Sequence, residues 1–367
     1  MASQDWKKVV YIYTLNKLLL IFIIWLTRDI ACAFLPASFE GRHPNALIDS
    51  LIHWDAGWFL KIADEGYDFY SAPFFPMLPL FIRLASTLTG DSAIAGLIVT
   101  NTALFVASYL LFCLAKEDHG EEAARTAVLA MLFFPTAVFF STIYSEPLFL
   151  AFALGCFWYA RKKKWLAASL CGACAALTRN VGITLFLPLL YRQLADNNFK
   201  FCFKKSLPLF LVPASLLIFM AVLWVKTGDP LAFSHSLKSD YWGNRHFSYP
   251  GAGQLTNLSL FFKNSEFYSL FESGMAFLYL FVIWRSFTHL KDKSYLFFLV
   301  PGFLIPFSSV VDNLPLGMPR YVLVLFPGYI TLAVQALKSG FVVVFAVVFI
   351  LAYSVISALF ILGRWIS

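Results

Sequence analysis

The sequence predicts an all-helical protein that crosses a membrane many times, and three observations support that prediction. Of the 367 residues, 60% are hydrophobic and only 13% are charged, about half of the roughly 25% that soluble domains carry. The mean hydropathy is +0.73. Hydrophobic runs long enough to cross the hydrocarbon core recur along the chain. A soluble fold of this length could not bury so much apolar surface, so lipid must surround it.

The first predicted span begins close to the N-terminus and is expected to be retained. Its apolar stretch runs from Val9 to about Trp25, which is longer than the core of a signal peptide. Arg28 and Asp29 then interrupt the approach to the small residues 31–33, where a signal peptidase would cut. We therefore expect a helix over 9–34.

Further apolar runs have the length of about 17–25 residues that crosses the hydrocarbon core as a helix. The run 165–191 is longer, and Thr178-Arg179-Asn180 breaks it at its centre, which predicts two short helices that meet at a polar corner. Nine single runs and this pair predict about 11 membrane segments in one domain over 1–367. Besides 9–34, the single runs are 92–115, 124–143, 146–160, 207–226, 267–284, 294–311, 320–337 and 340–362.

Basic residues predict the orientation of these segments, because Lys and Arg accumulate in cytoplasmic loops. The strongest marker is the run Arg161 to Lys164, and 16 of the 28 basic residues fall on one side if residues 73–90 do not cross the membrane. That stretch contains three prolines and an arginine, which favours an interfacial helix. The other side then receives two long loops, 35–91 and 227–266, and 14 of the 21 acidic residues.

Three other features of the sequence exclude alternatives. The net charge of +7 comes from these cytoplasmic loops, so nucleic-acid binding is not expected. Cys171-x-x-Cys174 has the spacing of a redox or metal site, but small apolar residues surround both cysteines, and we interpret them as packing residues. The sequence contains neither a repeat of fixed period nor an inverted pair of broken helices, which argues against a transporter.

The first long loop contains the densest group of polar and aromatic residues in the chain. At helical spacing Leu51, Trp54, Trp58 and Ile62 form an apolar stripe with Asp55 at its edge, which predicts an amphipathic helix at the membrane surface. Asp55 is then either the solvated rim of that helix or a base that takes a proton from an attacking hydroxyl. Composition alone leaves both interpretations open.

The same residues begin a series of motifs that resembles the PIG-V family, the mannosyltransferases of glycosylphosphatidylinositol assembly together with their bacterial relatives. Each motif is short, but together they keep the order and spacing of the family over roughly residues 51–327. The chain is short for a eukaryotic member, so the resemblance favours a bacterial plasma-membrane enzyme with a different acceptor. The matching segments are His53-Trp54-Asp55-Ala56 with Gly66-Tyr67, Phe74-Phe75-Pro76, Phe134-Pro135 with Tyr144-Ser145-Glu146, Thr178-Arg179 with Gly182, Thr227-Gly228-Asp229-Pro230, and Pro319-Arg320-Tyr321.

The resemblance implies a GT-C fold, which is an all-helical membrane glycosyltransferase that uses a polyprenyl-phosphate sugar as donor. In such enzymes an acidic residue of the first extracytoplasmic loop is the base, and the matching position here is Asp55. His53 and Trp54 beside it are expected to contact substrate. Chemistry at a carbon bonded to a lipid phosphate would invert that centre, and the departing phosphate must also be stabilised.

Arg179 and Arg320 are the candidates for binding that phosphate. Arg179 and Asn180 lie where two short helices meet at membrane depth, and an intramembrane arginine is a functional candidate by default, with a snorkelling side chain as the alternative. Arg320 precedes Tyr321 in a short outer loop near Asp312, so an ion-paired structural role is equally compatible with the sequence.

Glu146 starts a predicted span directly after Tyr144-Ser145, where the helix dipole favours an acidic side chain. The functional interpretation makes it a second carboxylate that orients the acceptor or shares a metal with Asp55. Because the sequence has no tight Asp-x-Asp cluster, no metal or cofactor is assigned, and the need for a divalent cation is left open.

The second long loop contains Trp242, Arg245 and His246 among other aromatic and basic residues. Such residues suit stacking on a sugar and pairing with an anionic lipid headgroup, and they equally suit a loop that rests on lipid. The histidines have no metal-ligand spacing.

The sequence therefore predicts an inverting transferase at the extracytoplasmic face. It would move a hexose, with mannose as the first expectation, from a polyprenyl phosphate to a hydroxyl of a lipid or glycan acceptor. The expected partners are that donor, that acceptor and membrane lipids. A lipid-linked-sugar transporter and a non-catalytic subunit of a transferase complex are the alternatives.

Overall fold

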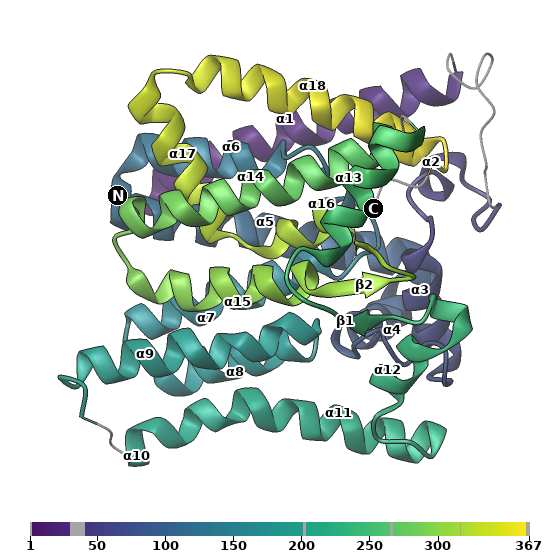
Figure 1. Ribbon diagram of the computed structural model, residues 1–367, viewed down its shortest axis with the longest axis horizontal. Helices are drawn as coiled ribbons and strands as arrows, with labels where there is room; N and C mark the ends of the chain where they lie inside the picture. The colour runs from purple at the N-terminus through teal and green to yellow at the C-terminus, as the bar shows by residue number, and fades with distance from the viewer. Residues whose placement is uncertain (1, 30–40, 201–202, 265–266, 316, 365–367) are drawn as a thin grey trace. The chain divides into compact units, whose positions relative to one another are not determined.

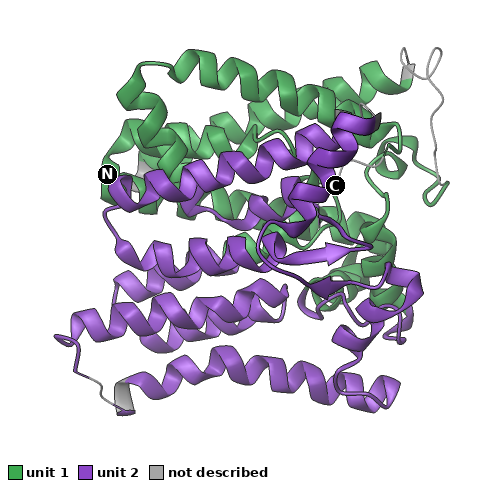
Figure 2. Cartoon of the chain, viewed as in Figure 1, with its two compact units in different colours: residues 1–64, 78–151, 329–366 green, residues 65–77, 152–328, 367 purple. Residues whose placement is uncertain are grey.

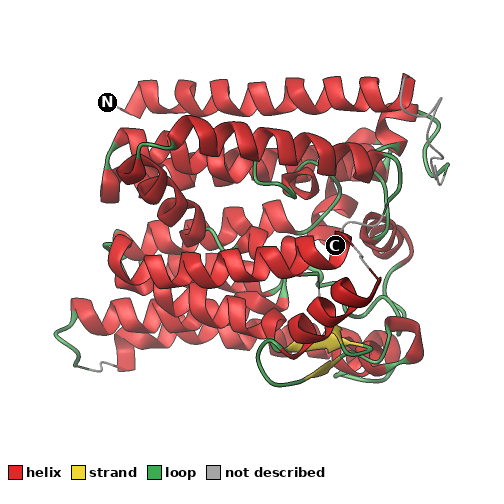
Figure 3. Ribbon diagram, turned by 45° about the horizontal axis from the view of Figure 1, so that its top comes forward, coloured by secondary structure: helices red, strands yellow, loops and turns green. Residues whose placement is uncertain are grey.

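The computed structural model describes residues 2–29, 41–200, 203–264, 267–315 and 317–364, and these are mostly helical (Figure 1). The strands in the described part of the chain are short and lie together (Figure 3). The chain divides into two compact units (Figure 2). Each unit is described by itself. The first contains residues 1–64, 78–151 and 329–366, and the second contains residues 65–77, 152–328 and 367.

Three long apolar helices form the frame of the first unit. All three are long and apolar enough to cross a membrane, which confirms the second and last predicted spans, and the first as far as Asp29. Residues 30–34 of the first predicted span lie outside the described residues. The second of them begins after Asp91, whose carboxylate accepts the Ile94 N–H at 2.8 Å as a helix cap. The helices are α1 (Ala2–Asp29), α5 (Ser92–His119) and α18 (Val342–Ile361).

One end of the first unit carries a network of opposite charges. Lys116 Nζ lies 2.7 Å from Asp5 Oδ1, and Lys8 Nζ lies 2.6 Å from Glu121 Oε2. These pairs join the start of α1 and the start of α6 (Glu121–Leu132) to the end of α5. Basic residues of α1, α5 and α6 thus gather at this end of the unit, where they pair with acidic residues.

The loop that contains Asp55 lies at the opposite end of the first unit. Arg28, in the last turn of α1, donates to the Ser50 hydroxyl at 2.7 Å. His43 Nε2 lies 3.1 Å from Asp91 Oδ2, at the start of α5. Two contacts therefore attach this loop to the helix ends that lie away from the basic network.

The prediction of one helix over 124–143 is wrong. The structure has the 12-residue α6, then turns and a short 3-10 helix η2 (Ala137–Phe140), and α7 (Glu146–Arg161) begins after them. Every residue from 131 to 150 is buried. Backbone without helical hydrogen bonds is tolerated at membrane depth only where protein or water encloses it, and here protein encloses it.

Polar side chains of α1 and α5 supply partners for this buried segment. The Asn16 amide donates to the Leu132 carbonyl at 2.7 Å, where α6 ends. Lys17 Nζ donates to the Ser141 hydroxyl at 2.6 Å, and the Asn101 amide donates to the Ser141 carbonyl at 3.4 Å. The break in the span is therefore stabilised by side chains that are distant in sequence.

Replacing Asn16 with Ala should lower the melting temperature of the purified protein. The Leu132 carbonyl would remain buried without this donor, which costs roughly 1–3 kcal/mol. Thermal unfolding in detergent, followed by tryptophan fluorescence, measures the change. Leu18→Ala is the matched control, because this side chain is 58% exposed on the same helix. Equal losses in both variants would show that the hydrogen bond is not the cause.

The second unit contains the predicted polar corner. The short helices α8 (Trp165–Ala176) and α9 (Phe186–Asp196) meet there through the 3-10 helix η3 (Asn180–Leu185), as predicted. Two further segments of this unit are long enough to cross a membrane and confirm the runs predicted at 207–226 and 267–284. They are Leu207–Thr227, which comprises η4 (Leu207–Phe210) and α11 (Leu211–Thr227), and α14 (Phe267–His289).

The runs 294–311 and 320–337 are not single helices, so these two predictions are wrong. After α15 (Leu296–Phe307) the chain forms strand β2, and a helical segment that ends at Val324 is interrupted before α17 (Pro327–Ser339). Proline at 315, 319 and 327 disfavours continuous helix here. The elements between are β2 (Ser309–Val311), β3 (Leu314–Pro315), α16 (Met318–Tyr321) and η8 (Val322–Val324).

The three strands form one antiparallel sheet in the order β1-β2-β3. β1 (His246–Phe247) comes from the second long loop and pairs His246 with Val310 of β2. β2 pairs Val311 with Leu314 of β3. The sheet therefore fixes the loop that contains Arg245 against the segment that leads to Tyr321.

The number of complete spans differs from the prediction. Within the described residues, five helices are long and apolar enough to cross a membrane, or up to six if the interrupted pair counts as one. The count of 11 is not confirmed, because several predicted spans are shorter helices joined by turns. Residues 73–90 contain one of these short helices, α4 (Met77–Thr89).

Asp292 joins several elements at the basic end of the second unit. Arg161 Nη2 lies 3.5 Å from Asp292 Oδ2 and donates to the Tyr295 hydroxyl at 2.6 Å. Arg192, near the end of α9, pairs with the same carboxylate. The polar corner lies at the far end of α8, which is 12 residues or about 18 Å long.

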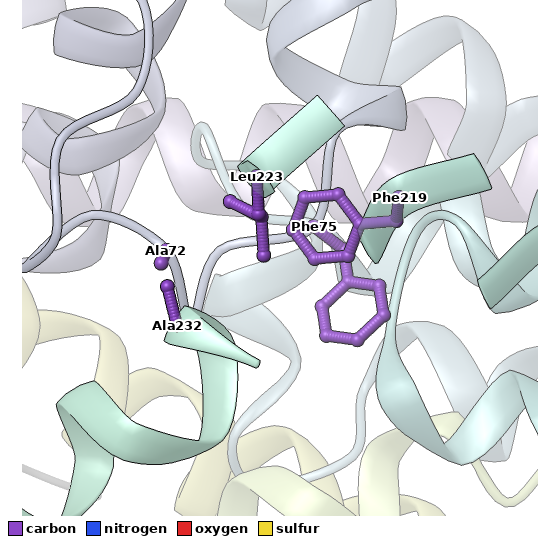
Figure 4. Close-up of a cluster of buried hydrophobic side chains, with 5 residues drawn as sticks. All are labelled: Ala72, Phe75, Phe219, Leu223 and Ala232. Atoms are coloured by element: carbon purple, nitrogen blue, oxygen red, sulfur yellow. The ribbon is translucent and has the colours of Figure 1, made fainter. Parts of the chain in front are cut away.

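A hydrophobic cluster attaches residues 65–77 to α11 and to α12 (Ala232–His235) (Figure 4). The rings of Phe75 and Phe219 are 4.8 Å apart, centroid to centroid. Nearby, the Tyr67 hydroxyl donates to the Phe74 carbonyl at 2.7 Å. Outer-loop backbone is thereby held against a membrane helix. The buried members of the cluster are Ala72, Phe75, Phe219, Leu223 and Ala232.

Candidate functional site

Asp55 is the first residue of α3 (Asp55–Glu65), and the residue before it has an unusual backbone conformation. Trp54 has φ +48°, in the left-handed region that bulky side chains rarely adopt. Holding a residue there costs roughly 1–3 kcal/mol, so surrounding contacts must maintain it. The Gly57 N–H donates to the Trp54 carbonyl at 3.0 Å, which closes the first turn directly after this kink.

Aromatic contacts maintain the kink. The ring centroids of His53, Trp54 and Phe360 lie 5.1–5.3 Å from one another, and His53 is 1% exposed. The Tyr144 hydroxyl donates to the His53 carbonyl at 3.1 Å. Trp54 and His53 therefore pack with the protein itself, and they orient the start of α3. Phe360 was missed in the sequence, because nothing distinguishes it within an apolar helix.

Glu146 is the first residue of α7 and is completely buried. Because Tyr144 contacts His53, the structure brings residues 144–146 to the segment that precedes Asp55. The helix dipole favours a carboxylate at this position, in agreement with the structural interpretation. A role for Glu146 toward substrate stays a prediction.

The second candidate cluster lies at the polar corner of the second unit. The Arg179 N–H donates to the Ala175 carbonyl at 3.0 Å, and the Gly182 N–H donates to the Arg179 carbonyl at 2.9 Å. A Cβ atom on Gly182 would lie 2.5 Å from the backbone of Ala175 and Ala176. Only glycine permits η3 to pack so closely against α8, and this packing sets the position of Arg179.

Three predicted site residues converge at this corner. Arg179 Cζ lies 5.6 Å from the centroid of the Tyr321 ring, and Arg245 Cζ lies 5.7 Å from it. Arg245 Nη1 also donates to the Tyr321 hydroxyl at 3.3 Å. All three side chains are partly exposed. Two guanidinium groups on one ring form a concentrated positive charge that favours an anion between or beside them.

Backbone contacts position Arg245 and its loop. Its N–H donates to the Leu237 carbonyl at 2.8 Å, and the Asp312 N–H donates to the Gly243 carbonyl at 3.1 Å. The hydrogen bond to the Tyr321 hydroxyl and the contact with its ring direct the Arg245 guanidinium toward the cluster.

Glu272 fixes the segment that contains Arg320 and Tyr321. It is 4% exposed in α14, and its Oε1 accepts the Met318 N–H at 3.1 Å. Sequence reasoning treated Glu272 only as one of the outer acidic residues, and its contact with Met318 depends on the tertiary fold. Arg320 is half-buried beside Tyr321, and its role stays a prediction.

Trp242 and His246, the other predicted residues of the second long loop, make contacts outside this cluster, whereas Asn180 follows Arg179 at the polar corner. The Trp242 Nε1–H donates to the Tyr70 carbonyl at 3.1 Å, so Trp242 attaches residues 65–77 to the second long loop. His246 is exposed in β1, and its Nδ1 lies 2.9 Å from the Asn244 carbonyl oxygen. Asn180 is exposed at the start of η3. Their roles toward substrate stay predictions.

The described residues do not include a group of three or more His, Cys, Asp or Glu side chains arranged to hold a metal ion. Among the four cysteines that the structure describes as free thiols, Cys171 and Cys174 lie in α8 among small residues, as predicted.

The chain is similar to proteins of known family over its N-terminal part. Residues 32–184 match the family model described as Mannosyltransferase (PIG-V). GPI mannosyltransferase 2 of Cryptococcus neoformans is 31% identical over 157 residues, which cover 38% of this chain and 37% of that protein. Human GPI alpha-1,6-mannosyltransferase 2 is 30% identical over 128 residues, which cover 31% of this chain and 26% of that protein. The match thus spans about a third of the length of these relatives.

The fold is similar to that of a solved membrane enzyme. The crystal structure of the Archaeoglobus fulgidus oligosaccharyltransferase in the apo form superposes with a TM-score of 0.50 at 13% identity, covering 98% of this chain and 56% of that one. At this identity the similarity concerns the fold alone. It agrees with the helical membrane fold that the sequence predicts.

Proposed function

Because this chain is a relative of the PIG-V mannosyltransferases, which it matches over residues 32–184, we propose that it is a membrane glycosyltransferase. It would move a hexose, with mannose as the first expectation, from a polyprenyl phosphate to a hydroxyl of a lipid or glycan acceptor. The observation that carries the proposal is the placement of Asp55 at the start of α3, directly after a strained and packed His53-Trp54 segment. Strain of this kind clusters at functional sites.

In the proposed reaction Asp55 acts as the general base. Its carboxylate takes the proton of the acceptor hydroxyl as the hydroxyl oxygen attacks the anomeric carbon. The new glycosidic bond forms while the bond from that carbon to the phosphate oxygen breaks, and the lipid phosphate leaves with the electron pair. Attack opposite the leaving group inverts the anomeric configuration.

The Arg179–Tyr321–Arg245 cluster is the proposed site for the donor phosphate. Guanidinium groups form paired, charge-assisted hydrogen bonds with phosphate oxygens. Arg320 is the third proposed contact, since it is adjacent to Tyr321 in α16.

We further propose that the reaction takes place on the extracytoplasmic face of a bacterial plasma membrane. Asp55 and its loop lie at the end of the first unit opposite the Lys8, Lys116 and Glu121 network. That network is the end that basic residues favour for the cytoplasm.

Transfer of radiolabel tests the function. The purified chain in lipid nanodiscs should convert polyprenyl-phosphate-[14C]mannose and a bacterial membrane lipid or glycan extract into a labelled product. Product that depends on both donor and protein supports the transferase. Uptake of the donor lipid by proteoliposomes without any product would support a transporter, and donor binding without either would indicate a non-catalytic subunit.

A further inference from the structure

Arg42, in the first long loop, lies unusually close to the first turn of α3. A Cβ atom built on Gly57 would lie 1.5 Å from Arg42 Nη1 and 2.7 Å from its Cζ. Real Cβ atoms essentially never approach that closely, so the guanidinium fills the space beside Gly57 in this structure. Arg42 is exposed and its guanidinium is the far end of a flexible side chain, and the absence of a side chain at Gly57 allows this cation to rest on the helix backbone.

The backbone next to Arg42 is held at two points. The Arg42 N–H donates to Asp49 Oδ1 at 2.8 Å, and Asp49 is 5% exposed. The next residue, His43, pairs with Asp91 at 3.1 Å. The hydrogen bond from the Ile94 N–H, together with nearby His43, holds the pKa of Asp91 below its ordinary value. Asp91 thus stays ionised for this pairing.

A cation at this position is unfavourable unless a negative charge accompanies it. The N-terminus of a helix carries a partial positive charge, which repels a guanidinium. Asp55 opens the same turn, and Cα atoms two residues apart in an α-helix lie about 5.5 Å from each other. Its carboxylate is therefore within one side-chain length of the guanidinium that rests on Gly57.

We propose that Arg42 is a positioning residue that holds the carboxylate of Asp55 through the space left by Gly57. The pair orients the carboxylate so that it can accept a proton from a hydroxyl. This inference rests on the proposed function of Asp55. It assigns a role to Arg42 in the first long loop. It also assigns a role to Gly57, a position that the family motif leaves unspecified.

The split between kcat and KM distinguishes this role from simple packing. A residue that orients a general base acts on turnover and leaves donor binding unchanged. Arg42→Ala should therefore lower kcat by about 10–100-fold with little change in the KM for the donor lipid, and Arg42→Lys should restore most of kcat.

Gly57→Ala provides the sharper test, because it leaves Arg42 in the chain. Ala favours helix over Gly, so a merely structural glycine would tolerate the change. We expect instead the same loss of kcat as in Arg42→Ala. The double variant should lose no more than either single variant, since both changes remove one interaction. Lys61→Ala is the charge-matched control on the same helix and should keep kcat near the wild-type value.

Thermal unfolding supplies a readout that does not need turnover. A double-mutant cycle isolates the interaction between two side chains. The melting temperature should therefore fall in Arg42→Ala, and most of this fall should vanish in an Asp55→Asn background. An unchanged kcat together with additive melting losses would overturn the proposal for Arg42. A wild-type chain without transfer activity that still shows this coupling in melting would instead reject the proposed function alone.

Discussion

Replacing Asp55 with Asn is expected to lower the turnover number of mannosyl transfer by about 10²–10⁴, the range for a positioned general base. The amide has nearly the same size and keeps the start of α3, so fold and donor binding should be retained. It lacks the negative charge and the basicity that a general base needs to accept the hydroxyl proton. The loss should therefore appear in kcat, with little change in the KM for the donor lipid.

The control for Asp55→Asn lies on the same helix. Asp64 accepts a hydrogen bond from the Ser92 hydroxyl at 3.1 Å, and Asp64→Asn removes the same charge from the same loop. This variant should transfer the sugar at nearly the wild-type rate. Normal transfer by purified Asp55→Asn would remove Asp55 from the mechanism, and Glu146→Gln would then be the next variant to measure.

Replacing Arg179 or Arg245 with Gln is expected to reduce kcat/KM for the donor by about 10–100-fold. A charge-assisted hydrogen bond to a phosphate contributes roughly 1.5–3 kcal/mol, which corresponds to this range. The two guanidinium groups share Tyr321, so the double variant should lose less than the product of the single losses. Donor affinity is measured with Asp55→Asn protein in nanodiscs, where turnover does not consume the ligand.

A cation of the same outer loop controls for general electrostatic effects. Lys238 is exposed in η5 (Ser236–Lys238), and Lys238→Gln should leave donor affinity within about twofold of the wild type. Arg179→Lys should recover only part of the affinity, because an ammonium group cannot form the paired hydrogen bonds of a guanidinium. Unchanged donor affinity in the Arg179/Arg245 double variant would assign both arginines to folding alone.

The length of the hydrophobic runs in the sequence predicted the uninterrupted helices well and the interrupted helices poorly. The spans at α1, α5, α11, α14 and α18 are confirmed, because a long hydrophobic run in lipid has no alternative to helix. The error at 124–143 has a specific cause. Asn16 and Asn101 supply hydrogen bonds to the buried residues around Ser141, and such partners cannot be paired from one sequence.

The candidate site, like the helices, could be predicted from the sequence only in part. The motif around Asp55, the polar corner at Arg179 and the Arg320-Tyr321 pair were all visible as separate segments. Their order in the chain did not reveal that Arg179 and Arg245 contact one tyrosine ring. Trp242 and His246 belong to the same aromatic and basic loop as Arg245, so the sequence did not distinguish the three residues. The structure places Trp242 and His246 in other contacts.

The sequence by itself determined that the chain is a helical membrane protein, which end of each helix carries basic residues, and which short motifs carry reactive side chains. These properties follow from residue type and local spacing, because hydropathy and charge belong to each residue and do not depend on its position in the fold. Tertiary structure alone decided where helices break, that two arginines meet on Tyr321, and that Gly57 admits Arg42 to the start of α3. Such contacts join residues that are far apart in sequence, and they exist only once packing brings those residues within a few ångströms.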